Sequence, residues 1–178
     1  MRPWAWSNSI LTRGPLELLP AFAGGLYQRG SAGLAVLTTL SGVGAILGGV
    51  LLSRAGNAVW LGVMARRSAM ILGMLVVVLG LAPGFWTGTA AVFVLGVCGV
   101  ISGVGLQVLL QKSISETFRG RVLGLWGLCN VAGPGVGGAI IGSATQVLGL
   151  RGATVAGGLI SSALALWIVR NARQAPQK

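Results

Sequence analysis

Glu17 is the residue of this sequence best suited to carry chemistry. It is one of only 2 acidic residues in a chain of 178, it lies in an apolar stretch, and it follows Arg13 by four positions. Because a carboxylate in hydrocarbon is costly, an intramembrane acid is a functional hypothesis by default. Two interpretations stay open. Glu17 binds a proton or a cationic substrate and couples it to a conformational change, or it pairs with Arg13 on one helix face.

Uncharged polar residues form a second, weaker set of candidates. Gln107 and Gln111 are one helical turn apart, on a face that they share with Gly99 and Gly103. Such side chains either line a substrate cavity or form a hydrogen bond between helices. The hydrogen bond is favoured for Gln111, the choice is open for Gln107, and Asn130 is a weaker candidate for the same two roles.

The glycine- and proline-rich stretch at 133–138 predicts a local weakness in a helix. Pro134 removes one backbone hydrogen bond, and Gly133, Gly137 and Gly138 place no side chains around it. The bend either moves, as a hinge for alternating access, or is a static kink that only aids packing.

The residues that enzymes and metal sites need are not found in a useful pattern. The sequence has no histidine, and it contains no recognisable nucleophile–base set or pair of carboxylates. Cys98 and Cys129 both fall in apolar runs, where we expect them to pack as small side chains. We therefore expect a protein that is not an enzyme and that uses no metal or other cofactor.

Six long apolar runs must position these residues. The composition is 54% hydrophobic and 8% charged, whereas a soluble domain carries about 25% charged residues. Each run is close to the ~20 residues with which a helix crosses about 30 Å of hydrocarbon. The pattern predicts an all-α, polytopic membrane bundle of six transmembrane helices, in which Gly44 and Gly48 bring two backbones close together. The expected spans are Ser9–Leu26, Leu34–Leu52, Ser68–Phe85, Ala90–Leu110, Val122–Leu148 and Ala153–Val169.

The 13 basic residues are distributed unevenly over the loops between these runs. With both termini in the cytoplasm, only Arg29 and Arg151 lie outside, as the positive-inside rule requires. The basic residues are scattered singly and form no face for nucleic acid, despite a net charge of +11. We expect a multi-pass protein of the cell membrane, with a cytoplasmic segment at 1–8, a transmembrane domain at 9–170 and a cytoplasmic tail at 171–178.

Three stretches of the sequence carry a resemblance to a known family. The first, at 13–23, resembles that family's seventh helix. The second, at 49–56 with Arg66 and Arg67 after it, is similar to a cytoplasmic loop of the form Gly-x-Leu-x-Asp-Arg-x-Gly-Arg-Arg, although Ser53 stands where the acid belongs.

The third stretch joins 119–125 to 133–138, whose Gly-Pro-x-x-Gly-Gly core matches a motif associated with antiporters. In this order and spacing, the stretches resemble the C-terminal six-helix half of a major facilitator superfamily transporter, in the drug- and enterobactin-exporter-like branch. The resemblance implies two inverted three-helix repeats and secondary transport, namely proton-coupled efflux of a small organic compound.

The resemblance also implies that basic residues at the inner ends of the helices make gate contacts. The alternative is that they only set the topology and attract anionic lipid. These residues are Arg54, Arg66, Arg67, Arg119 and Arg121.

A transporter of this kind builds its substrate path between two six-helix halves. Met1 falls where the family's central loop would lie, so we expect a truncated transporter that needs the missing N-terminal half or a second copy of itself. The alternative function is a membrane scaffold or regulatory subunit that packs through glycine-rich helix faces. Transport predicts that Glu17 and Gln107 face one cavity, whereas a scaffold buries them in unrelated contacts.

Overall fold

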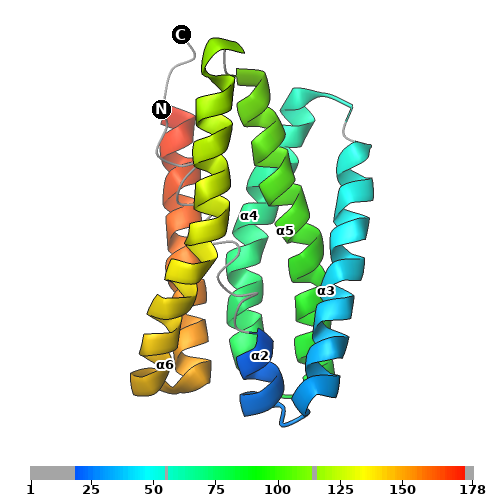
Figure 1. Ribbon diagram of the computed structural model, residues 1–178, viewed down its shortest axis with the longest axis vertical. Helices are drawn as coiled ribbons and strands as arrows, with labels where there is room; N and C mark the ends of the chain where they lie inside the picture. Colours follow the sequence, from blue (N-terminus) through cyan, green and yellow to red (C-terminus); the bar gives the residue numbers. More distant parts are fainter. Residues whose placement is uncertain (1–18, 55, 114–115, 175–178) are drawn as a thin grey trace.

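The computed structural model describes residues 19–54, 56–113 and 116–174, and every regular element in them is a helix (Figure 1). The predicted all-α class is therefore confirmed. Most of the first expected span, Ser9–Leu26, lies outside the described residues. The elements are α2 (Leu19–Ala21), the π-helix η2 (Phe22–Leu26), α3 (Gly30–Ser53), α4 (Ala58–Leu81), α5 (Phe85–Ser113) and α6 (Glu116–Gln174).

Three helices of the described part are long and apolar enough to cross a membrane, namely Gly30–Ser53, Val59–Leu81 and Phe85–Leu109. Helices α3 and α5, to which the first and third belong, contain the expected spans Leu34–Leu52 and Ala90–Leu110. Helices of this length and composition place the chain in a lipid bilayer. The number of six spans and the two inverted repeats stay predictions.

Helix α6 consists of two antiparallel runs that meet at Gly149 (Figure 1). Gly149 has φ 69° and ψ 165°, a conformation that glycine adopts readily because it has no Cβ. The break falls between the expected fifth and sixth spans, Val122–Leu148 and Ala153–Val169, and so agrees with that boundary.

Helix α4 starts earlier than the third expected span, Ser68–Phe85. It begins at Ala58, because the side-chain oxygen of Asn57 accepts a hydrogen bond of 2.8 Å from the backbone N–H of Trp60 and caps the helix. Arginine is a good helix former, so the basic residues that were expected to close a loop continue this helix instead.

Helix α4 also ends earlier than expected, at Leu81. The residue before Pro83 is kept out of the α region by the proline ring, which stops the helix. Phe85 is then the first residue of α5, and the Thr87 hydroxyl accepts a hydrogen bond of 3.3 Å from the Gly84 N–H at this start.

Helix α5 is the central element of the bundle. It packs against both α3 and α4, and α4 in turn packs against α6. The side chains of Leu37, Leu79 and Val92, one from each of α3, α4 and α5, are fully buried in the apolar core. This arrangement makes the position of α5 dependent on both of its neighbours.

Helices α3 and α5 touch through their backbones, as the pair Gly44 and Gly48 predicted. A Cβ atom at Gly44 would collide with the carbonyl oxygen of Phe93, and one at Gly48 would lie 2.5 Å from the carbonyl oxygen of Val97. The contact is reciprocal, because a Cβ at Gly96 of α5 would collide with the carbonyl oxygen of Ser41 on α3. Side chains are therefore excluded from this crossing on both helices.

Helices α4 and α6 make a second contact of the same kind. A Cβ at Gly158 of α6 would lie 2.8 Å from the backbone nitrogen of Val77, and one at Gly73 of α4 would lie 2.9 Å from the backbone nitrogen of Ser162. Small residues repeat every four positions along α6, at Thr154, Gly158 and Ser162, which is the spacing that lets membrane helices approach closely.

We predict that Gly96→Leu destabilises the protein. The new side chain must force α3 and α5 apart, and overpacking of this kind costs about 1–3 kcal/mol. Thermal unfolding of the purified chain in detergent should therefore occur at a lower temperature than in the parent. Gly42→Leu on α3 is the matched control, since a Cβ at Gly42 meets nothing within 4 Å, and equal losses in the two variants would contradict the proposed packing.

Candidate functional site

One side of α5 combines glycine and glutamine, and its glycines have no neighbour among the described residues. Within that part of the chain, a Cβ added at Gly99 or Gly103 would meet no atom within 4 Å, and the side chains of Gln107 and Gln111 are half-buried. By contrast, a Cβ at Gly105 would lie 3.1 Å from the Cβ of Ala65 on α4. We call the face formed by Gly99, Gly103, Gln107 and Gln111 the open face of α5.

The open face has the properties of a lining for a small molecule. Its two glycines leave room beside the helix, and its two amides supply donors and acceptors at a depth where the rest of α5 is apolar. The neighbouring Ser102 is fully buried, so the open face borders directly on the packed side of the helix.

The other candidate residues of the sequence are placed only in part. Glu17 and Arg13 lie outside the described residues, and their pairing stays a prediction. The backbone of Asn130 belongs to the helical run of α6, but its side chain is outside the described part.

The expected hinge at 133–138 lies within the helical run of α6. Gly133, Pro134 and Gly137 belong to this run by their backbone alone, and Gly138 is half-buried. The non-helical backbone that interrupts α6 is at Gly149. Movement at 133–138 therefore stays a prediction.

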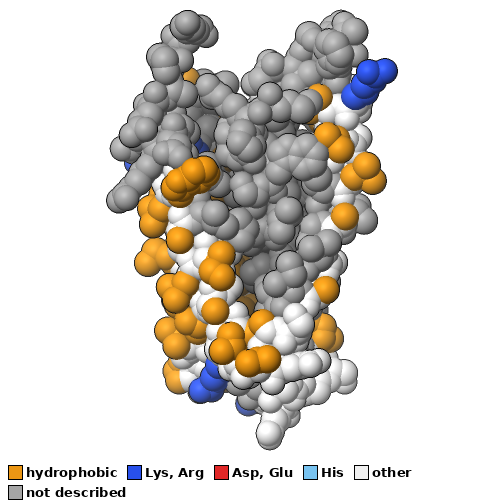
Figure 2. Space-filling model, turned by 90° about the vertical axis from the view of Figure 1, so that its left-hand side faces the viewer, with side chains coloured by type: hydrophobic (Ala, Val, Ile, Leu, Met, Phe, Trp, Pro, Cys, Tyr) orange, Lys and Arg blue, Asp and Glu red, His pale blue; other side chains and the backbone are white. Residues whose placement is uncertain are grey.

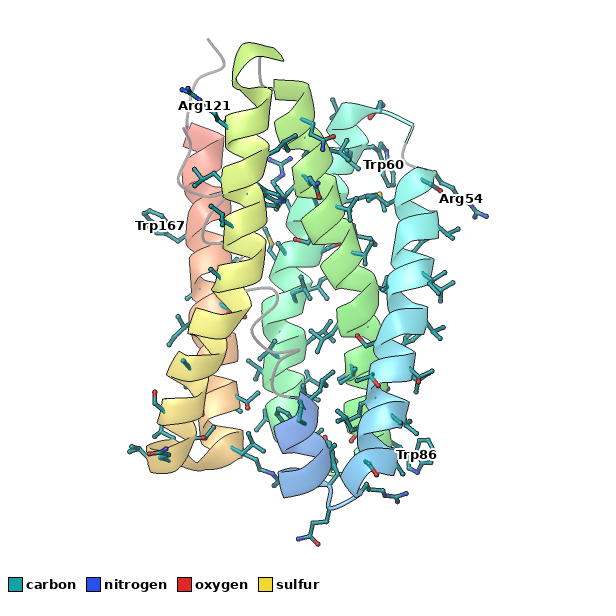
Figure 3. All side chains as sticks on the ribbon, in the orientation of Figure 1. Arg54, Trp60, Trp86, Arg121 and Trp167 are labelled. Atoms are coloured by element: carbon teal, nitrogen blue, oxygen red, sulfur yellow. The ribbon has the colours of Figure 1, made fainter. Side chains whose placement is uncertain are left out.

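The basic residues gather at one end of the bundle. Arg54 caps the C-terminus of α3 and Arg121 lies in the first turns of α6, and Figure 3 shows both at the end that also carries Trp60. The side chains of Arg54, Arg121 and Trp60 are all exposed. Arg29 and Arg151 belong to the opposite end, where α3 begins and α6 turns at its break. Among the described residues, Arg54 and Arg121 thus lie at one end and Arg29 and Arg151 at the other, and the assignment of the first end to the cytoplasm stays a prediction.

Two of the proposed gate residues occupy a different element than expected. Arg66 and Arg67 are exposed side chains about two turns inside α4, not the end of a loop. Arg119 belongs to α6 by its backbone, and its side chain is outside the described part.

A cluster of Tyr27, Arg29 and Phe85 at the opposite end of the bundle was not predicted from the sequence. The Arg29 guanidinium carbon lies 5.0 Å from the centre of the Phe85 ring, within the range of a cation–π contact. The Tyr27 ring meets the same Phe85 ring edge-on, with 5.6 Å between centroids. These contacts connect the turn after η2 with the start of α5. They join residues that are far apart in the sequence, so no local sequence pattern predicts them.

Tyr27 carries a polar group that has no partner among the described residues. Its hydroxyl oxygen is buried and forms no hydrogen bond within that part of the chain, and it lies so close to Gly88 that a Cβ there would collide with it. Burial raises the pKa of Tyr27, while the positive charge of Arg151 opposes the shift. The phenol is therefore neutral at physiological pH.

Metal binding finds no support in the described residues, among which no group of three His, Cys, Asp or Glu side chains comes together. The described part is instead a helical membrane protein with an open, partly polar face on its central helix. This is the class of structure in which membrane transporters are built.

Curated proteins with similar sequences are exporters. The chain is 28% identical over 156 residues to the enterobactin exporter EntS of Citrobacter koseri, which covers 84% of this chain and 38% of the exporter. It is 26% identical over 125 residues to EntS of Escherichia coli O1:K1, which covers 70% of this chain and 30% of the exporter. EntS of Shigella flexneri matches at 26% over 127 residues, or 71% of this chain and 31% of the exporter.

The similarity is therefore distant, and the chain spans roughly a third of the length of these relatives. No family model matches the chain. No solved structure matches it either.

We predict that Tyr27→Phe leaves the protein as stable as the parent or more stable. A buried hydroxyl without a partner costs about 1–3 kcal/mol, and phenylalanine keeps the ring contact with Phe85. Tyr27→Ala is the matched variant that removes the ring and should lower the unfolding temperature measured in detergent. A loss of stability in Tyr27→Phe equal to that in Tyr27→Ala would show that the hydroxyl has a partner.

Proposed function

We propose that this chain carries out secondary active transport, as proton-coupled efflux of a small organic compound. The observation that carries the proposal is the open face of α5. A helix that packs against both α3 and α4 has no structural need for two glycines and two glutamines on a side where the described residues place no neighbour within 4 Å of the glycines. A binding face for a small molecule explains both the space and the polarity.

The relatives support the direction and the substrate class. They are exporters of one small organic compound, enterobactin, by name. Because the chain spans about a third of their length, the proposed transport unit contains more than this chain's helices. We assign the remainder to an N-terminal six-helix half or to a second copy, with the substrate path between the two units and both termini in the cytoplasm.

Proton coupling is assigned to Glu17. Among the 2 acidic residues, Glu17 is the one that lies in an expected span, and a carboxyl group that alternates between charged and neutral forms is a common proton carrier in membrane transporters. In this proposal Arg13, one turn away, holds the carboxylate in its charged form.

The second candidate function is a membrane scaffold without transport. It is favoured by the exposed side of α3, where Gly42 and Gly49 meet nothing within 4 Å and Ile46 is 68% exposed. Such a side accommodates a helix of another protein at close distance. This function needs no open face on α5, which separates it experimentally from transport.

The test is enterobactin release from Escherichia coli cells that lack their own exporter and produce this chain. If transport is correct, Gly103→Leu fills the open face and reduces release at least tenfold, with the amount of membrane protein unchanged. Ala90→Leu is the control, since Ala90 is an exposed small residue elsewhere on α5. Equal release from Gly103→Leu and the parent would contradict the proposal. Release from neither would contradict assembly of the transport unit from two copies of this chain.

We predict separately that Glu17→Gln abolishes proton-driven export while the protein is still produced in normal amounts. The amide cannot bind a proton, but it keeps the size and polarity of the side chain. The measurement is proton flux into vesicles together with the amount of protein in the membrane. A loss of protein that Arg13→Gln restores in the double variant would instead show that the two residues form a structural pair.

A further inference from the structure

Helix α4 presents an exposed stripe along its whole length. Its exposed fractions lie between 45% and 68% at Trp60, Ile71, Met74, Val78 and Leu81. Together with position 67, these residues follow one another at spacings of three, four and seven, which keep side chains on one face. Arg67 lies on the same stripe, seven residues after Trp60, and is also exposed. An otherwise apolar, lipid-facing stripe therefore contains one arginine.

The depth of this arginine follows from helix geometry. From Trp60 to Leu81 the helix rises about 31 Å, which equals the thickness of the hydrocarbon core, about 30 Å. Arg67 then lies about 10 Å below the level of Trp60. A cation at this depth needs a polar partner or a route to the headgroups.

Arg66 shows the direction of that route. Its Nε donates a hydrogen bond of 3.2 Å to the carbonyl oxygen of Gly62, one turn nearer the start of α4. The side chain thus bends toward the Trp60 end, as long basic side chains do when they reach for the membrane interface.

The surrounding charge at this end is positive as well. Arg54 and Arg121 lie at the same end of the bundle as Trp60 (Figure 3). The side of the molecule that Figure 2 presents likewise shows basic side chains near its two ends and hydrophobic side chains between them. Arg54 and Arg121 therefore add positive charge that favours the approach of an anion to this end.

We propose that Arg66 and Arg67 bind the headgroup of an anionic phospholipid, with Trp60 packing beside its glycerol region. The headgroup supplies the oxygens that the two guanidinium groups lack. The indole of Trp60, about 10 Å nearer the membrane surface than the Arg67 backbone, suits the interface that these side chains reach for, because its ring is apolar and its N–H is polar. This site is independent of the transport function proposed above.

The test uses the purified full chain in nanodiscs of phosphatidylcholine that contain a minor fraction of phosphatidylglycerol. Phosphatidylglycerol retained by the protein is counted by native mass spectrometry. We expect Arg67→Gln to lower its retention about fivefold relative to phosphatidylcholine, which corresponds to about 1 kcal/mol for each basic residue near the surface. The double variant of Arg66 and Arg67 should lose about 25-fold.

Two further variants decide the interpretation. Arg67→Lys keeps the charge and should retain most of the phosphatidylglycerol, which shows that the helix is intact. Arg151→Gln removes an exposed arginine from the opposite end and should change retention little. Equal loss in Arg151→Gln and Arg67→Gln, unchanged retention in Arg67→Gln, or equal retention of the two lipids by the parent would each overturn the proposal.

Discussion

Backbone contact between helices is the constraint on which the rest of this structure depends. Lipid tails are as apolar as leucine, so burial from water does not hold membrane helices together, and close packing must do so. The chain meets this requirement with glycine at two crossings, Gly44 against Gly96 for α3 and α5, and Gly73 against Gly158 for α4 and α6. At each crossing a single Cβ would collide with the backbone of the other helix.

These two crossings explain why α5 has two different sides. One part of the helix is fixed on α3 by Gly96, and Gly105 lies against Ala65 of α4. On the remaining side, no described residue lies close enough to Gly99 and Gly103 for them to act as spacers. Glycine thus serves two purposes on one helix, and only the surroundings distinguish them.

This distinction also marks what could be predicted from the sequence. Apolar runs predicted α3 and α5, and the spacing of Gly44 and Gly48 predicted a close crossing, because both properties are local. The partner glycine, Gly96, could not be predicted, since it depends on the register between two helices. The start of α4 was missed because Arg66 and Arg67 suggested a loop, whereas the cap at Asn57 starts the helix before them.

Part of the candidate site could likewise be predicted from the sequence, and part of it could not. The common face of Gly99, Gly103 and Gln107 follows from helical spacing, but its freedom from neighbours required the structure. The Arg29–Phe85 contact joins residues more than fifty positions apart, and no local pattern contains it. Roles for Glu17 and Arg13 rest on sequence alone, because these residues lie outside the described part.

The glycine crossings also bear on how the membrane meets the protein. Helix α4 is held by Gly73 and Gly80 against α6, and by Ala65 against α5, so it is fixed at several points along its axis. A single helix in lipid can slide or tilt to bring an arginine to the interface. A helix fixed at several points cannot do so without breaking those contacts. The depth of the backbone at Arg66 and Arg67 is therefore set by the packing of glycines on the other side of α4. Only the long side chains can reach the interface, as that of Arg66 does toward Gly62.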